Sequence, residues 1–227
     1  KFRITVGAPA YKFDEEYTVV ANNSIQIKIP LELVVTIGSE EIQERAIHLT
    51  SEKPVNVYAL NYERNTSDAA LIFPVESLGK EYFAMCYYPD HNAGDPDRSN
   101  SQFLIVATED STLVEITPVK VTDKLKPKDS TFVVTINRGE VYQVQSENSL
   151  DKRALGQGDL TGSYISSNKP IAFYSGAQST TIPSGVCCWD HLYEQIPPIH
   201  SWGLEYYLVP LKSRLGDRYR IMAANDN

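Results

Sequence analysis

One ten-residue stretch of this chain occurs twice, and the spacing between its two copies is that of a small domain. Residues 49–58 read LTSEKPVNVY and residues 165–174 read ISSNKPIAFY, so the two Lys-Pro pairs lie 169 − 53 = 116 residues apart. FLIVATED, beginning at Phe103, returns as YRIMAAND, beginning at Tyr219, again at 219 − 103 = 116. Ordered matches at one interval indicate an internal duplication, and the interval is too long for a solenoid repeat.

The duplication predicts two structural units within the 227 residues. LGKEYF from Leu78 also matches WGLEYY from Trp202, at 202 − 78 = 124, so the second copy carries eight additional residues before this point. We expect a first unit at 1–95, a second unit at 96–215, and the first strand of a third copy at 216–227.

Short alternating runs separated by turn residues predict an all-β fold. Each unit reads as a β-sandwich, so the fold class is two tandem sandwich-like units; a β-propeller-like arrangement is the alternative. Three pairs of alternating runs predict hairpins. They are YTVV and SIQIKIP around 21–23, SQFLIVA and TLVEIT around 109–111, and TFVVTI and EVYQVQ around 137–139.

Other segments predict strand starts and loops. Proline cannot donate to a strand ladder, so each Lys-Pro pair predicts a turn followed by a strand. Residues 38–49 contain helix formers and predict at most one or two helical turns. Proline, glycine and aspartate predict surface loops at 89–100, 121–129 and 178–189.

The charge balance argues against two classes of partner. The chain has 21 Lys and Arg against 29 Asp and Glu, a formal net charge of −8. Nucleic acids and anionic membranes both need clustered Lys and Arg, so neither is an expected partner. No apolar run is long enough to span a bilayer. Because the chain begins and ends inside recognisable repeat elements, we expect it to be a piece of a longer protein.

Three cysteines leave the redox state open. Cys86 pairs with Cys187 or Cys188 in one interpretation, and all three are reduced thiols in the other.

Catalytic and metal-binding motifs are absent from the sequence. There is no G-x-S-x-G, no H-E-x-x-H and no phosphate-binding loop before a helix. We therefore expect no enzyme activity and no cofactor. The stretch 95–100 begins like a calcium loop but lacks the glycine and the glutamate that an EF-hand needs, so an interdomain loop is the preferred interpretation.

The densest polar and aromatic cluster lies near the end of the second unit. A metal site built from His191, Glu194 and His200 would need a helix there, whereas the following Pro-Pro pair favours an extended chain. We expect no metal, and we expect either internal hydrogen bonds or a contact surface. The candidate binding residues are Trp189, Asp190, His191, Tyr193, Glu194 and Gln195. Trp189, Tyr193 and Trp202 are the candidate aromatic anchors, with core packing as the alternative for each.

Taken in order, these segments resemble the IgGFc-binding protein N-terminal domain family. The residues that carry the resemblance are IHLTSEKPVNVYALNY (47–62), DAALIFPVESLGKEYF (68–83), SQFLIVATEDSTLVEITP (101–118), RGEVYQVQS (138–146), DLTGSYISSNKPIAFYSG (159–176), DHLYEQIPP (190–198) and YRIMAANDN (219–227). In that family a cysteine directly precedes the Asp-His pair, whereas Trp189 stands there in this chain and Cys188 lies one residue earlier.

The resemblance implies a non-catalytic, extracellular or cell-surface adhesion module. The expected partner is a protein or glycoprotein; immunoglobulin Fc and mucin-type molecules are candidates, but the resemblance does not imply that this copy binds immunoglobulin. We expect the contact surface to lie on the long loops 89–100 and 178–195. A structural spacer or stalk and a carbohydrate-binding module are the alternatives.

Overall fold

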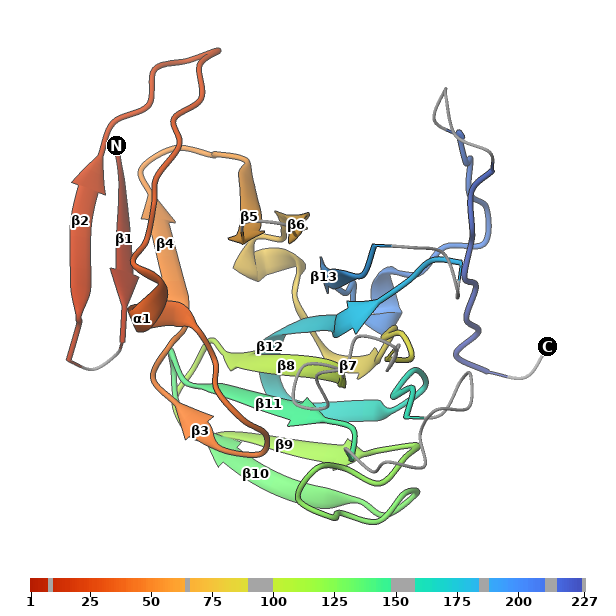
Figure 1. Ribbon diagram of the computed structural model, residues 1–227. Coiled ribbons are helices and arrows are strands. Elements are labelled where there is room, and N and C mark those ends of the chain that lie inside the picture. Colours follow the sequence, from red (N-terminus) through yellow and green to blue (C-terminus); the bar gives the residue numbers. More distant parts are fainter. Residues whose placement is uncertain are drawn as a thin grey trace.

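The computed structural model describes residues 1–7, 10–63, 66–89, 100–147, 158–183, 188–210 and 216–225. Strands dominate, and the helical elements are single turns (Figure 1). The strands are β1 (Phe2–Val6), β2 (Phe13–Tyr17), β3 (Ile42–Gln43), β4 (Ile47–Ser51), β5 (Val57–Glu63), β6 (Thr66–Ile72), β7 (Gly79–Phe83), β8 (Ser101–Ala107), β9 (Thr112–Thr117), β10 (Phe132–Ile136), β11 (Val141–Gln145), β12 (Tyr164–Thr180) and β13 (Asp190–Gln195). The helical turns are α1 (Leu31–Val34), η1 (Val75–Ser77) and η5 (Ile199–Ser201).

The largest sheet is built around β12, which has 17 residues. The first part of β12 pairs with β9 up to Ser167, and its second part pairs with β8 from Ile171 onwards. β7 and β13 also pair with β12, β10 pairs with β9, and β11 pairs with β8. All of these pairings are antiparallel.

The strands of this sheet bend along a common line. β8 and β9 lie one after the other along β12. In the next layer of pairing, β11 lies beside β8 and β10 lies beside β9. The bend falls at 108–111, at 137–140 and at 168–170, where the ladders change partner. Bends of this kind let a strand leave one layer of a sheet and enter another.

One core lies inside the bent sheet. Alternate residues of the strands on both sides of the bend belong to a single buried cluster, as period-2 side-chain placement requires. Its largest members include Tyr82, Phe103, Ile105, Ile116, Ile136, Ile165, Ile171 and Phe173. The all-β fold class is confirmed, and the largest sheet is nearly closed, like a barrel.

Polar side chains replace the ladder hydrogen bonds at the bend. Asn168 Oδ1 accepts the N–H of Leu113 at 2.9 Å, and Thr108 Oγ1 donates to the carbonyl of Pro170 at 2.6 Å. Lys169 Nζ donates to the carbonyl of Asp110. Pro170 therefore lies inside β12 and not at a strand start, in the segment where neither β8 nor β9 forms a ladder with it.

Two of the predicted hairpins are wrong. The segments around 109–111 and 137–139 do turn, with φ of 54° at Ser111 and 79° at Gly139. Yet β8 does not pair with β9, and β10 does not pair with β11. Each turn is part of the bend. A polar turn between alternating runs looks the same in sequence whether the strands fold back or continue around a corner.

The N-terminal predictions also need correction. The turn at 21–23 is present, with the N–H of Asn23 donating to the carbonyl of Val20, but 24–29 forms no strand. The stretch 38–49 forms no helix: it contributes β3 and the start of β4. The reason is tertiary, because this segment pairs with the free edge of β11, as in the hydrogen bond from Glu40 N–H to the carbonyl of Gln143.

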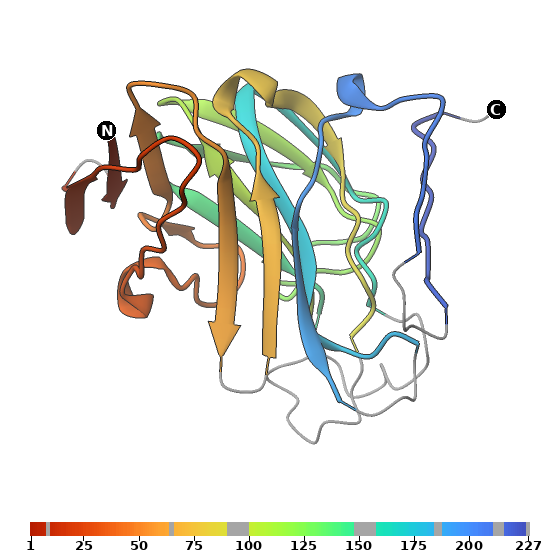
Figure 2. The same ribbon diagram turned by 90° about the horizontal axis from the view of Figure 1, so that it is seen from above.

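Two smaller sheets flank the large one. β1 lies between β2 and β4, and β5 pairs with β6 (Figures 1 and 2). Figure 2 shows β5, β6 and β13 side by side. β7, which lies in the first predicted unit of 1–95, pairs with β12 of the second.

Cys86 is a free, buried thiol, whereas Cys188 belongs to a disulfide. Both alternatives drawn from the sequence, a bridge that includes Cys86 and three reduced thiols, are therefore wrong. The Sγ of Cys86 donates to the carbonyl of Gln102 at 3.1 Å, and burial raises the pKa of the Cys86 thiol to about 12. None of the helical turns in the described ranges is long enough to cross a membrane.

The phenol of Tyr82 gives a direct test of the core. Tyr82 is fully buried; its hydroxyl accepts the N–H of Gly79 at 2.8 Å and donates to the carbonyl of Ile171 at 2.7 Å. Tyr82→Phe leaves both groups unsatisfied, so we expect a loss of about 1–3 kcal/mol in unfolding free energy, measured by denaturant titration. Tyr11→Phe, at a half-exposed position, serves as the control and is expected to change stability by less than about 0.5 kcal/mol.

The thiol of Cys86 gives a second test. Because it is buried and its pKa is raised, we expect no reaction with a thiol reagent at neutral pH until the protein is unfolded in denaturant. Cys86→Ala should remove the signal that appears on unfolding. Rapid labelling of Cys86 in the folded protein would contradict the buried position.

Candidate binding surface

The predicted binding residues lie on β13 and immediately before it. β13 is extended, as expected, so His191 and Glu194 project to opposite faces and cannot share a metal ion. No group of three His, Cys, Asp or Glu side chains suited to a metal occurs within the described ranges. One edge of β13 pairs with β12, and the other lies beside β6.

Gly176 allows β12 and β13 to approach closely. A Cβ atom at this position would overlap the carbonyl oxygen of Leu192 on β13. The ladder runs from Tyr174 opposite Gln195 to Ala177 opposite Leu192, and an irregularity follows before Thr180.

Side chains, not a backbone ladder, join β6 to β13. Asp68 Oδ2 accepts the N–H of Tyr193 at 2.8 Å, and Gln195 Oε1 accepts the N–H of Phe73 at 2.7 Å. The Thr66 hydroxyl donates to Asp190 Oδ1. These contacts, which we call the β6–β13 junction, satisfy backbone N–H groups at a strand edge that would otherwise be open.

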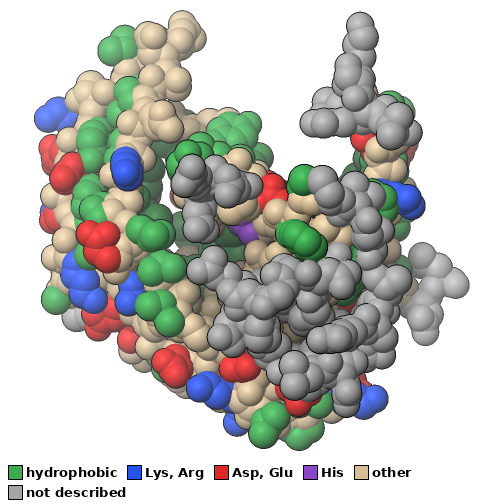
Figure 3. Space-filling model, viewed as in Figure 1, with side chains coloured by type: hydrophobic (Ala, Val, Ile, Leu, Met, Phe, Trp, Pro, Cys, Tyr) green, Lys and Arg blue, Asp and Glu red, His purple; other side chains and the backbone are tan. Residues whose placement is uncertain are grey.

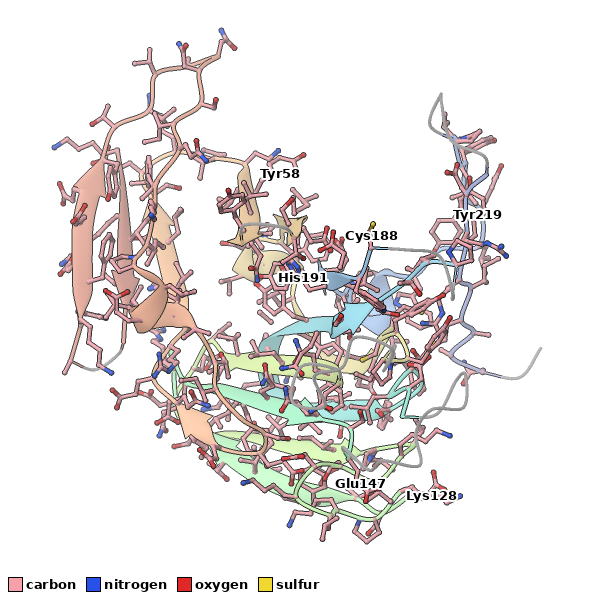
Figure 4. The ribbon with its side chains drawn as sticks, in the orientation of Figure 1. Tyr58, Lys128, Glu147, Cys188, His191 and Tyr219 are labelled. Carbon is pink, nitrogen blue, oxygen red and sulfur yellow. The ribbon has the colours of Figure 1, made fainter. Side chains whose placement is uncertain are left out.

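Thr66, Asp190 and His191 form a close cluster without the geometry of a catalytic triad. Thr66 Oγ1 lies 2.6 Å from His191 Nδ1, and Asp190 Oδ1 lies 3.3 Å from the same nitrogen. In a triad the carboxylate and the nucleophile use different nitrogens of the imidazole. Here both approach Nδ1, while Nε2 is buried and makes no hydrogen bond in the described structure. The cluster therefore supports the junction; Figure 4 labels its imidazole, His191.

Tyr193 packs instead of standing free. Its ring stacks on Tyr174 with centroids 5.3 Å apart and planes 5° apart. Burial raises the pKa of Tyr174 to about 12 and raises the pKa of Tyr193 further, so both phenols stay protonated at physiological pH. Trp202 is also packed: its ring lies 6.3 Å from that of Phe83, and its Nε1 donates to the carbonyl of Pro197.

Two predicted residues remain exposed. Trp189 has 41% of its surface exposed, and Glu194 also faces solvent. Burial, and to a smaller extent the charge of Asp68, raises the pKa of Glu194. Gln195, by contrast, is 1% exposed and acts only within the junction.

The β5–β6 hairpin carries an apolar surface that was not predicted from the sequence. The face of the hairpin that carries Thr66 and Asp68 turns toward β13, so the opposite face is open to solvent. That face, which we call the hairpin patch, consists of Tyr58, Leu60, Tyr62 and Leu71, which are 68%, 58%, 74% and 38% exposed. Hydrophobic atoms gather over this hairpin in Figure 3. The alternation Tyr-x-Leu-x-Tyr in β5 was the available signal.

Parts of the predicted contact loops lie outside the described residues. These are 90–99 and 184–187, which include Cys187 and almost all of the calcium-like stretch 95–100. The aromatic residue nearest to the second gap, Trp189, directly precedes Asp190, which Thr66 contacts at the same end of the hairpin as Tyr62.

The raised pKa of Glu194 has two causes, burial and the charge of Asp68, and a substitution at Asp68 separates them. Asp68→Asn keeps an acceptor for the N–H of Tyr193 but removes the negative charge near Glu194. We expect the pKa of Glu194 to fall yet to stay above its ordinary value, because burial is the larger cause of the shift. NMR titration of the Glu194 carboxyl measures it, and a fall to the ordinary value would show that repulsion by Asp68 is the main cause.

When a carboxyl has a higher pKa in the folded state than in the unfolded state, the folded state binds more protons at pH values between the two. Stability therefore falls as pH rises through that range. Asp68→Asn should therefore flatten the pH dependence of stability above the unfolded pKa of glutamate. Asp68→Ala, which also removes the acceptor, should be less stable than Asp68→Asn at every pH.

Comparison with known proteins gives a consistent result. The sequence pattern described as "IgGFc binding protein" matches residues 68–227, which is more than half of the chain. The human protein named "IgGFc-binding protein" is 27% identical over 214 residues, a stretch that covers 93% of this chain and 4% of the human protein. No solved structure matches. With the pattern matched across β6 to β13 and beyond, the chain belongs to the IgGFc-binding protein family.

Proposed function

We propose that this chain is a non-catalytic extracellular or cell-surface module that binds a protein or glycoprotein through the hairpin patch and the adjoining start of β13. The observation that carries the proposal is the orientation of the β5–β6 hairpin. Its polar face is used to hold β13, and its apolar face is presented to solvent.

The composition of the hairpin patch supports a binding role. Two tyrosines and two leucines lie on one face of a two-stranded sheet, each more than one-third exposed. Contiguous exposed apolar surface marks interaction sites in soluble proteins, and tyrosine is enriched among the residues that contribute most to binding. Trp189 adds a third aromatic side chain beyond Tyr62.

The predicted residues of β13 have two roles in this proposal. Trp189 and Glu194 face solvent and contact the partner. Asp190, His191, Tyr193 and Gln195 hold β13 against β6 and β12, and thereby fix the hairpin relative to the large sheet. A pre-organised surface loses less conformational entropy on binding.

Two features support a non-catalytic role. The thiol of Cys86 is buried and has a pKa of about 12, so it is not a nucleophile at neutral pH. The imidazole of His191 has its Nε2 buried, so it cannot relay a proton to a bound substrate. The family is named for binding, not for a reaction.

The name of the human relative supports a partner class and a location. Immunoglobulin Fc, the partner in that name, is an extracellular glycoprotein domain, and it is the first partner that we propose for this chain. Mucin-type glycoproteins are the second, and either partner would place the chain outside the cell or on its surface.

Carbohydrate binding is a second candidate function. Tyr58 and Tyr62 lie on the same face of one strand and are 68% and 74% exposed, an arrangement that could stack against sugar rings. A structural spacer is the remaining alternative, and it requires no binding at all.

The test is a binding measurement on the folded chain. Immobilised immunoglobulin Fc, mucin glycoproteins and a glycan array are each exposed to the wild-type chain and to Tyr58→Ser/Tyr62→Ser. We expect binding to Fc or mucin, and a loss of at least about tenfold in affinity for the double variant, since buried aromatic anchors contribute most of the interface energy.

Tyr11→Ser is the matched control, because Tyr11 is 52% exposed and lies outside the hairpin; it should bind like wild type. Binding to glycans alone would establish the carbohydrate alternative. Absence of binding on all three surfaces would overturn the binding proposal in favour of a spacer. Binding that the double variant retains in full would place the contact elsewhere.

A further inference from the structure

An exposed turn lies between β2 and α1. The N–H of Asn23 donates to the carbonyl of Val20 at 3.1 Å, and the side-chain Nδ2 of Asn23 donates to the carbonyl of Ala21 at 3.3 Å. All residues from 20 to 26 are exposed, and 18–30 belongs to no strand. In Figure 1 this segment projects beyond the ends of β1 and β2. The turn is therefore open to solvent and lies outside the sheets.

Asn22 occupies the third position of this turn. Its φ is 63°, a left-handed conformation that asparagine adopts more readily than most residues with a side chain. Asn23 uses its amide within the turn. By contrast, neither the amide of Asn22 nor the hydroxyl of Ser24 makes a hydrogen bond to any of the described residues. Both side chains are exposed, so both groups are available to another molecule.

Asn22, Asn23 and Ser24 form an acceptor triplet for N-linked glycosylation. The pattern requires an asparagine, any middle residue except proline, and a third residue with a hydroxyl group. The sequence contains one other such triplet, at 65–67, whose asparagine lies outside the described residues. A triplet alone is a weak signal, because short patterns arise by chance. Here the triplet coincides with an exposed turn in which the acceptor amide and the hydroxyl are both unused.

We propose that Asn22 carries an N-linked glycan. The site rests on the extracellular or cell-surface location of the proposed function, because oligosaccharides are attached to asparagine in secreted and surface proteins. A bulky, hydrated group attached at this turn displaces no strand ladder, since the turn belongs to none. The chemical class of the donor is an oligosaccharide linked to a polyprenyl diphosphate.

The transfer step is a substitution at the first sugar. The Nδ2 of Asn22 attacks the anomeric carbon of the oligosaccharide, and a carbon–nitrogen bond forms. The bond between that carbon and the diphosphate oxygen breaks, and the polyprenyl diphosphate leaves with the electron pair. One Nδ2 proton passes to a base of the transferase. No group is oxidised or reduced, so the step needs no further reactant.

Two apolar side chains flank the acceptor. Val20 is 68% exposed and Ile25 is 44% exposed. An oligosaccharide attached between them covers part of this apolar surface with a strongly hydrated group. The glycan on Asn22 therefore raises the solubility of the turn, in addition to marking the chain as a secreted one.

Site-resolved mass spectrometry tests the proposal. The full 227-residue chain is secreted from cultured animal cells behind a signal peptide. Peptide-N-glycosidase then releases the glycans in heavy-oxygen water, which converts each glycosylated asparagine into a labelled aspartate. Trypsin places the two triplets in separate peptides, 13–28 and 65–80. We expect the label at Asn22, and we expect Asn22→Gln to remove it together with the mass of one oligosaccharide.

Variants within the triplet supply the controls. Ser24→Ala should abolish the label, whereas Ser24→Thr should keep it because the hydroxyl is retained. Asn23→Gln should also keep it, since the middle position accepts glutamine. Secreted wild type with a strand-rich circular dichroism spectrum and no label at Asn22 would overturn the proposal. The readout is a mass, so a labelled chain that binds neither Fc nor mucin would overturn the proposed function and leave the glycan site intact.

Salting-out tests the effect on the apolar side chains. Glycosylated wild type should stay soluble at a higher ammonium sulfate concentration than Asn22→Gln. Val20→Ser/Ile25→Ser, added to Asn22→Gln, should recover part of the difference. Tyr11→Ser, added in the same way, should recover less, because Tyr11 is 52% exposed but lies outside the turn. Equal solubility of wild type and Asn22→Gln would show that the glycan does not cover these side chains.

Discussion

The bend of the large sheet depends on polar contacts made where backbone ladders are interrupted. At 168–170 the long central strand changes its partner from β9 to β8, and Asn168, Lys169 and Pro170 supply the hydrogen bonds that the ladder lacks. Two of these three hydrogen bonds are exposed and one is part-buried, and a typical intramolecular hydrogen bond contributes about 0.5–1.5 kcal/mol to stability, so together they favour the corner over an open arrangement. Because the strands bend along one line, apolar side chains from both sides of the corner meet in a single core. The Asn-Lys-Pro sequence is thus a corner, and its position determines where every other strand of the sheet can lie.

The corner also determines where the binding surface can form. Beyond it, the second part of β12 carries β13, and β13 holds the β5–β6 hairpin through Asp68, Thr66 and Gln195. These contacts use the face of the hairpin that carries Thr66 and Asp68, on which Ala70 is fully buried. The larger apolar side chains lie on the opposite face. Polar contacts on the inner face therefore explain how a hairpin with four large side chains on its outer face stays attached to the protein while that outer face remains open.

Much of the fold could be predicted from the sequence, and the limits have physical causes. Period-2 alternation correctly indicated β8 to β12 and the extended form of β13, because side-chain alternation is a local property of a strand. The turn residues at 109–111 and 137–139 predict hairpins where the structure has bends, because turn residues do not encode which strand the next strand will pair with. The junction was beyond reach, because Asp68 and Tyr193 are separated by 125 residues and neither shows a motif. The hairpin patch was visible as alternation in β5, but local sequence does not say which face a neighbour will cover.

The face of the β5–β6 hairpin and the contacts that hold it have separate roles. Partner binding needs the face of β5, which carries Tyr58, Leu60 and Tyr62. An isolated two-stranded hairpin is marginally stable, so the hairpin patch depends on the side-chain contacts that Thr66, Asp68 and Gln195 make across the β6–β13 junction. Because these contacts lie on the opposite face from the patch, they can make the patch rigid without covering it. A rigid patch loses less conformational entropy when it binds, so partner affinity should depend on the junction as well as on the exposed aromatic side chains.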